Sequence, residues 1–268
     1  MAGLGCGTQK KGSLTFAPEA GTQRLRDVIN KNVSEEEVLG ALRAAYEAGW
    51  RRTKLYFMLG LPTETDEDVV AIVELANRAY NAAKDAVPNE DRGKVRMSIS
   101  VAVFVPKAHT PFQFSGQVPR EELLRRVQLL KAARLSKGID LHWHDPAASM
   151  IEAVFSRGDS SLAALGIRAW ELGARFDAWS DQFDLALWEQ AADELGLDLQ
   201  GLASRTLELD EALPWDFITG GVSRHFLVRE YERALSTGEI TPDCTTGPCG
   251  SCGVCGGAVR TVVAGTRG

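Results

Sequence analysis

Residues 55–65 read LYFMLGLPTET, an apolar run that leads through a Gly/Pro turn into an acidic helix start. Mostly apolar runs bounded by turn signals are typical of strands in a parallel sheet that are buried on both faces, and we expect this of the strand at 53–60. α/β enzymes build small-molecule sites at the carboxyl ends of such strands. The stretch therefore predicts a fold class and the edge of the sheet at which a ligand would bind.

The same arrangement occurs earlier, where residues 14–22 read LTFAPEAGT. Strands are expected at 13–17, 53–60, 95–105 and 139–143, with helical patterns between them. The helix after Ser34 begins with a capping box, in which Glu37 reaches back to the serine backbone. Strands joined by crossover helices run parallel, so the sequence predicts an α/β fold.

After Pro146 the pattern becomes mainly helical. Helices are expected at 147–156, 160–173, 184–195 and 222–235. Dense aromatic residues favour a helical core or its seam with the α/β part; they are Trp170, Phe176, Trp179, Phe183, Trp188, Trp215 and Phe217. The predicted regions are a disordered or artificial start at 1–12, an α/β part at 13–145, a helical region at 146–240 and a Cys-rich tail at 241–268.

Composition narrows the class of protein. The 268 residues include 44% hydrophobic and 25% charged residues, as is ordinary for a soluble globular chain. No apolar run is long enough for a membrane span, and no secretory signal is present. The net charge of −6 gives no electrostatic support for nucleic-acid binding. We expect a chain of the reducing cytoplasm with no membrane or nucleic-acid partner.

Two turns contain candidate ligand-binding residues. Gly60 would let a ligand approach the backbone closely, Pro62 would stiffen the turn, and Thr65 would cap the next helix, whose free N–H groups attract polar atoms. Glu19, at the end of the first strand, could accept hydrogen bonds from an ammonium group or from ribose hydroxyls. A plain βα loop and a solvated loop carboxylate are the alternatives.

Residues 16–25 and 54–65, followed by residues 104–112, resemble the later βα units of radical S-adenosylmethionine (radical SAM) enzymes. The nearest resemblance is to a bacterial subgroup whose full-length members also carry a cobalamin-binding domain. It implies that S-adenosylmethionine is held by Glu19, Gly21, Thr22, Gly60, Pro62, Glu64 and Thr65. It also implies a partial, open (βα) barrel of three or four strands.

This chain lacks one motif that defines the family. The motif C-x3-C-x2-C, which binds the [4Fe–4S] cluster, does not occur in this chain, and Cys6 has no neighbouring cysteine. We therefore expect the C-terminal portion of such an enzyme, whose missing half or partner chain carries the cluster and any cobalamin domain. A complete relative would form a 5′-deoxyadenosyl radical for hydrogen abstraction or methyl transfer on an unknown substrate. Catalytic residues are not assigned.

The tail supplies a separate metal-binding pattern. Cys244, Cys249, Cys252 and Cys255 lie within twelve residues, interspersed with glycines. Four thiolates at this spacing can bind Zn²⁺ or an Fe–S cluster, and the tight run favours iron–sulfur. The competing hypothesis for the whole chain is a non-catalytic metal-binding or interaction module left by truncation.

Histidine is rare in the chain. His142, His144 and Asp145 could bind a metal if the histidines shared one face of a strand. Packing at the strand end or a substrate contact is the favoured interpretation. His109 is expected in a loop, at most lining a pocket.

Overall fold

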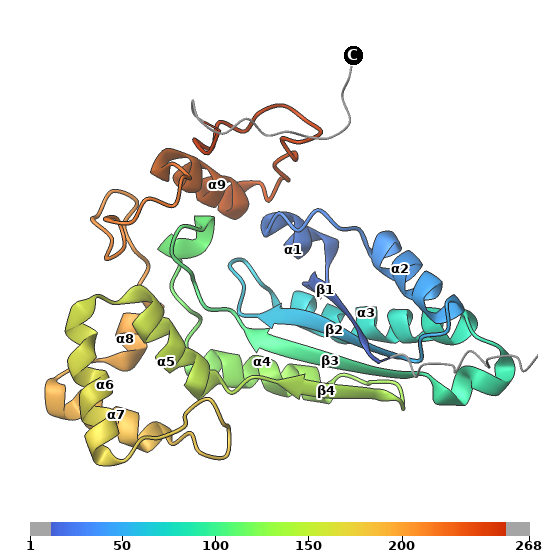
Figure 1. Ribbon diagram of the computed structural model, residues 1–268, viewed down its shortest axis with the longest axis horizontal. Coiled ribbons are helices and arrows are strands. Elements are labelled where there is room, and N and C mark those ends of the chain that lie inside the picture. Colours follow the sequence, from blue (N-terminus) through green and yellow to red (C-terminus); the bar gives the residue numbers. More distant parts are fainter. Residues whose placement is uncertain (1–11, 256–268) are drawn as a thin grey trace, which may run out of the picture.

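The computed structural model describes residues 12–255, and a four-stranded parallel sheet forms its centre (Figure 1). The strands are β1 (Leu14–Glu19), β2 (Arg52–Leu59), β3 (Arg96–Val103) and β4 (Ile139–Trp143), in that spatial order. All three strand pairs are parallel. The sheet does not close in the described part of the chain, which confirms the predicted α/β class and open sheet.

One face of the sheet is covered by helices. These helices are α2 (Glu35–Glu47), α3 (Asp66–Asp85) and α4 (Arg120–Ala132), with α3 in contact with three strands. Helix α1 (Gln23–Val28) lies instead beyond the end of β1 and packs against the C-terminal helix α9 (Arg224–Ser236). Capping boxes begin α2 at Ser34 and α3 at Thr65, as the Ser-x-x-Glu and Thr-x-x-Asp patterns indicate. Short 3₁₀ helices lie at η1 (Asn89–Lys94), η2 (Pro111–Phe114) and η3 (Ser160–Leu162).

The opposite face of the sheet is more exposed than the sequence predicts. Along β2, Leu55, Phe57 and Leu59 are buried, whereas Lys54, Tyr56 and Met58 are only half-buried. The expectation that this strand is buried on both faces is therefore wrong. The cause is the open sheet, because among residues 12–255 helices cover only the face that carries Leu55 and Phe57.

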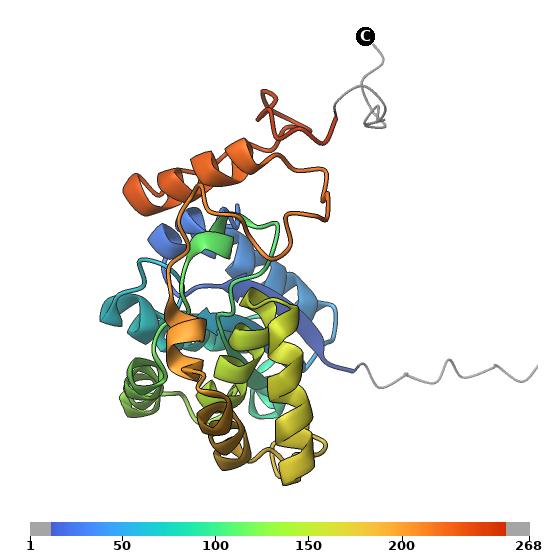
Figure 2. The ribbon, with the colours of Figure 1, turned by 90° about the vertical axis from the view of Figure 1, so that its left-hand side faces the viewer.

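The region after β4 is helical, as predicted. It consists of α5 (Pro146–Arg157), α6 (Ala163–Leu172), α7 (Leu185–Leu195), α8 (Leu199–Ser204) and α9 (Arg224–Ser236). Helix α8 was not predicted, because its six residues are too few to show a helical period. The strands point toward α5 and α9, and Figure 2 shows α9 as a separate layer above the sheet.

The aromatic residues of this region do not form one core. Trp188 and Trp215 are buried in two different clusters, whereas Trp170, Trp179 and Phe217 are exposed. The prediction of a helical core or of its seam with the α/β part thus holds for Trp188, in the helical cluster, and for Trp215, which packs with Phe114, but not for the exposed aromatic residues. No helix among residues 12–255 is long and apolar enough to cross a membrane. The predicted start at 1–12, with Cys6, and the tail beyond 255 lie almost wholly outside the described residues.

Candidate functional site

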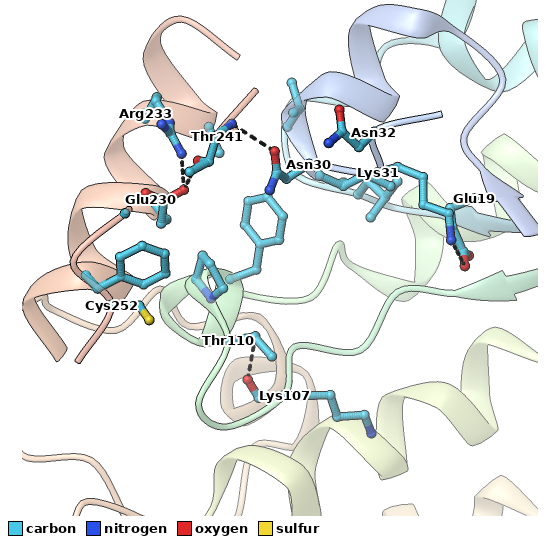
Figure 3. Close-up of a pocket in the computed structure, with 18 of the residues that line it drawn as sticks. Glu19, Asn30, Lys31, Asn32, Lys107, Thr110, Glu230, Arg233, Thr241 and Cys252 are labelled. Carbon is cyan, nitrogen blue, oxygen red and sulfur yellow. Dashed lines mark hydrogen bonds and ion pairs between the residues drawn. The ribbon is translucent and has the colours of Figure 1, made fainter. Parts of the chain in front are cut away.

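A cavity of about 1350 Å³ lies at the carboxyl ends of the strands, between the sheet and α9 (Figure 3). Its floor comes from the ends of β1, β2 and β3, and its far wall comes from α9 and the tail. Met58, Leu61, Phe104, Phe112 and Phe226 give it a largely apolar lining. A concave apolar pocket with a few polar groups is the usual form of a small-molecule site.

Glu19 brings a carboxylate into this cavity from the last residue of β1. Its backbone is left-handed, with φ of 69°, and the register with β2 shifts between Phe16 and Glu19. Left-handed backbone is uncommon for a residue with a long side chain, and such strain clusters at functional sites. The side chain is one-quarter exposed and pairs with Lys31 Nζ at 3.2 Å.

The loop after α1 forms the adjoining wall. Asn30 and Asn32 both have left-handed backbone, at φ of 55° and 49°, and both line the cavity together with Lys31. Asn30 Oδ1 accepts a hydrogen bond of 2.9 Å from the backbone N–H of Thr241, the first residue of the tail. The loop therefore ties the sheet side of the cavity to the tail.

The loop from Lys107 to Phe112 forms a third wall, and a buried glutamine holds it. Gln113 Oε1 accepts hydrogen bonds of 2.9 Å from His109 N and from Trp215 Nε1. Lys107 Nζ pairs with Glu152 of α5, and both residues line the cavity. Through Gln113 this wall is joined to the segment that leads into α9.

Two of the predicted cofactor residues, Gly21 and Thr22, pack the first turn against α3. A Cβ built on Gly21 would lie 2.3 Å from Ile72 N, so only glycine fits there. Thr22 caps α1 and donates its hydroxyl hydrogen to Asp68. Asp68 also accepts from Arg24 and from Thr65 N, so one carboxylate joins the starts of α1 and α3. The buried Asp68 loses hydration, yet these hydrogen bonds outweigh that loss and lower its pKa.

The other turn is organised by Glu64, which points into the interior. Its side chain is fully buried, and Oε2 accepts from Gly60 N at 2.7 Å and from Arg126 Nη1 at 2.6 Å. Burial outweighs both hydrogen bonds and raises the pKa of Glu64 to about 7. Gly60 has φ of 86° and faces Leu123 of α4, where a Cβ would lie 2.9 Å from Cδ2.

The structure thus brings together only part of the predicted cofactor set. Glu19 lines the cavity, as does Leu61 in the second turn. The residues that shape the two turns without lining the cavity are Gly21, Thr22, Gly60, Pro62, Glu64 and Thr65. Their contact with a cofactor stays a prediction, and within the described structure they position the cavity floor.

All four tail cysteines line the same cavity: Cys244, Cys249, Cys252 and Cys255. None forms a disulfide. The tail is anchored to α9, because Ser223 N donates to Cys252 O at 2.7 Å and Arg229 donates to Gly250 O. Among residues 12–255, no three His, Cys, Asp or Glu side chains are grouped so that they could hold a metal ion.

The residues at the end of β4 that were considered as metal ligands lie in different surroundings. Asp145 caps α5 by accepting from Ala147 N at 2.9 Å, and His144 lines the cavity. His142 is exposed on β4. His109 packs beside Gly220 and is not among the lining residues.

The sequence did not indicate most of the polar residues that line the cavity. They come from the loop after α1 and from later parts of the chain. These residues are Asn30, Lys31, Asn32, Lys107, Glu152, Glu230, Arg233 and Thr241. Asparagine adopts left-handed backbone more readily than most residues, so the Asn-Lys-Asn run could have indicated a special loop. Glu230 carried no such signal, because one acidic residue in an amphipathic helix is ordinary.

Comparison with known proteins relates this chain to a family. Residues 9–76 match the family model described as the Radical SAM superfamily. An uncharacterized protein of Methanocaldococcus jannaschii is 33% identical over 154 residues, which cover 58% of this chain and 32% of that protein. The chain therefore spans about a third of the length of the relative it matches. No solved structure matches the chain. The family match supports membership of the radical SAM superfamily, and the open parallel sheet is consistent with a partial radical SAM barrel.

Proposed function

We propose that the cavity binds S-adenosylmethionine and that this chain supplies the cofactor-binding and substrate-binding part of a radical SAM enzyme. The observation that carries the proposal is Glu19, a carboxylate on left-handed backbone that lies both in the cavity and within the matched residues 9–76. Cytoplasmic location and a cobalamin domain elsewhere in a longer protein belong to the same proposal and rest on the resemblance.

The chain's own residues would bind and orient the cofactor. Glu19 would accept hydrogen bonds from its ammonium group or ribose hydroxyls, and Lys31 would hold the carboxylate in place. Met58 and Leu61 would pack against its flat apolar part. In this superfamily the bound cofactor supplies radical chemistry that starts at an iron–sulfur cluster. The C-x3-C-x2-C ligands of that cluster are absent from this sequence, so the cluster would have to be supplied by another part of the enzyme.

The size of the cavity supports a second ligand beside the cofactor. Pockets for single small molecules measure roughly 300–1,000 Å³. A volume of about 1350 Å³ exceeds that range, so a cofactor would leave room for a substrate. The proposed substrate region is the part of the cavity near α9, away from Glu19.

Binding of S-adenosylhomocysteine, a stable analogue of the cofactor, tests the proposal by isothermal titration calorimetry. Glu19→Gln should raise the dissociation constant about tenfold, because hydrogen bonds to a charged group contribute roughly 1.5–3 kcal/mol. Glu36→Gln is the matched control, since Glu36 is exposed on α2 and is not among the lining residues. Absence of binding to the wild type, or unchanged binding to Glu19→Gln, would contradict the proposal.

We also propose that the tail binds one Zn²⁺ or iron–sulfur centre through its four thiolates. The support is the C-x4-C-x2-C-x2-C spacing. The same spacing favours the competing hypothesis that the whole chain is a non-catalytic metal-binding module. The described arrangement does not gather three of these ligands, so the tail would have to rearrange.

Titration of the reduced chain with Co²⁺ checks this proposal through thiolate-to-metal absorption. One equivalent should bind, and Cys252→Ser should weaken binding at least about tenfold because a thiolate ligand is lost. Cys6→Ser, a cysteine outside the tail, should leave the titration unchanged. Sub-stoichiometric binding in the wild type would exclude the tail centre.

A further inference from the structure

Three phenylalanine side chains from separate parts of the chain line the cavity. Phe104 follows β3, Phe112 lies in η2 and Phe226 lies in α9. All three are half-buried, so each keeps a surface that a ligand can contact. The ring of Phe112 lies 6.0 Å from that of Phe104 at an interplanar angle of 88°, and 6.4 Å from that of Tyr231 at 76°. Aromatic rings prefer such edge-to-face contacts, and a flat ring in the cavity would find them here.

The backbone that carries two of these rings is held by buried amide side chains. Gln117 is buried, and its Nε2 donates to Phe104 O at 3.2 Å and to Ser149 O at 3.1 Å. Phe112 precedes Gln113, whose buried side chain accepts the two hydrogen bonds described above. The rings are therefore positioned before a ligand arrives, which reduces the entropy lost on binding.

The polar side chains of the cavity wall beside these rings already have partners within the chain. Thr110 Oγ1 donates to Lys107 O at 2.7 Å, Lys107 Nζ pairs with Glu152, and Arg233 pairs with Glu230. All of these residues line the cavity. A polar or charged ligand group would have to replace these contacts, whereas an apolar group would leave them intact. The surface that remains available for a ligand is therefore the aromatic one.

The charges near Phe226 decide between a cationic ligand and an uncharged one. Aromatic rings also attract cations, so both kinds have to be considered. The guanidinium carbon of Arg229 already lies over the ring of Phe226, 5.1 Å from its centroid. Arg233 adds a second guanidinium group to the same wall of the cavity. A cationic ligand would be repelled by these groups, and an uncharged ring would not.

We propose that Phe104, Phe112 and Phe226 form a subsite that binds one uncharged aromatic ring of the substrate. The cavity exceeds the usual volume for one ligand, so this ring would lie beside the cofactor and not in its place. The inference rests on the proposed function, because it names the chemical class of the substrate for the same cavity.

Benzyl alcohol and cyclohexylmethanol test the subsite, because they share the same heavy atoms and differ in whether the ring is aromatic. Their dissociation constants can be measured by NMR titration of the full chain, and the ratio of the two gives the preference for the aromatic probe. Phe112→Leu keeps an apolar side chain but removes a ring. It should lower the preference about fivefold relative to the wild type, because one aromatic contact is lost. Phe226→Leu should lower it in the same way.

Phe217→Leu is the matched control, since Phe217 is 85% exposed and is not among the lining residues. It should keep the wild-type preference. Retained binding of cyclohexylmethanol shows that the cavity of a variant is intact, and if Phe112→Leu lost both probes, Phe226→Leu would decide. The subsite would be refuted by an unchanged preference in either intact variant, or by a wild type that binds neither probe.

S-Adenosylhomocysteine distinguishes the substrate from the cofactor as the occupant of the subsite. When the analogue is saturating, benzyl alcohol should bind with an unchanged dissociation constant. Competition between the two would show that the rings hold the cofactor, and the assignment to the substrate would be wrong. If the analogue did not bind while the preference for benzyl alcohol persisted, the proposed function would fail and the aromatic subsite would stand.

Discussion

Replacement of Gly21 by alanine should lower the free energy of unfolding by about 3 kcal/mol, since overpacking against fixed backbone costs about 1–3 kcal/mol or more. The added Cβ would lie 2.3 Å from Ile72 N, 2.5 Å from Ala71 C and 2.8 Å from Asp68 O. All three are backbone atoms of α3, so no side chain can rotate away. The start of α1 would have to move off α3, which would also disturb the contacts of Asp68. Urea unfolding followed by circular dichroism measures the loss.

Gly40→Ala is the control for this substitution. Gly40 lies within α2, and a Cβ there would meet nothing within 4 Å. Alanine should therefore stabilise the chain by about 0.5–1 kcal/mol through its higher helix propensity. If Gly21→Ala were as stable as Gly40→Ala, the close contact between α1 and α3 would be refuted.

The free energy of unfolding of the wild type should fall as the pH rises past the pKa of Glu64. In Glu64→Gln this fall should be absent. Burial raises the pKa of Glu64 to about 7, against an ordinary value of 4.5. Between these values the folded state binds more protons than the unfolded state, so the free energy of unfolding falls with rising pH. The stabilisation is fully present below pH 4.5 and is lost as the pH passes 7. Its size is on the order of 3 kcal/mol, at about 1.36 kcal/mol for each pH unit.

The measurement is the free energy of unfolding at about pH 5 and about pH 8, on either side of the raised pKa, for wild type and variant. Glutamine keeps the acceptor for Gly60 N and Arg126 but does not titrate, so its values should differ much less between the two pH values. Glu67→Gln, an exposed neighbour on α3, should follow the wild type. Parallel pH profiles for Glu64→Gln and wild type would show that Glu64 does not carry the effect.

The parts of the fold that depend on local sequence could be predicted. The capping boxes at Ser34 and Thr65 mark the starts of α2 and α3, because both partners lie within one turn. The four strands follow from apolar runs of suitable length. The exposed face of β2 could not be predicted, since Tyr56 and Met58 are apolar enough for either environment and only the open sheet decides.

The site was harder to predict because its polar contacts join distant elements. Glu19 was identified by its position after a strand, and it lines the cavity. Glu64 follows the next strand in the same way, yet Arg126 of α4 and Gly60 N hold it in the interior. Which way such a carboxylate points depends on a helix residue 62 positions away, and one sequence does not show that pairing.

The hydrogen bond from Thr241 N to Asn30 Oδ1 forms only after most of the chain has been synthesised. It joins residues 211 positions apart, and it closes the cavity between the loop after α1 and the tail. Synthesis proceeds from the N-terminus, so β4, which ends at Trp143, is complete about 100 residues before Thr241 is added. A nascent chain can therefore hold its sheet while the cavity still lacks a wall. Ligand binding would then distinguish chains in which the tail is in place from chains that end before Thr241.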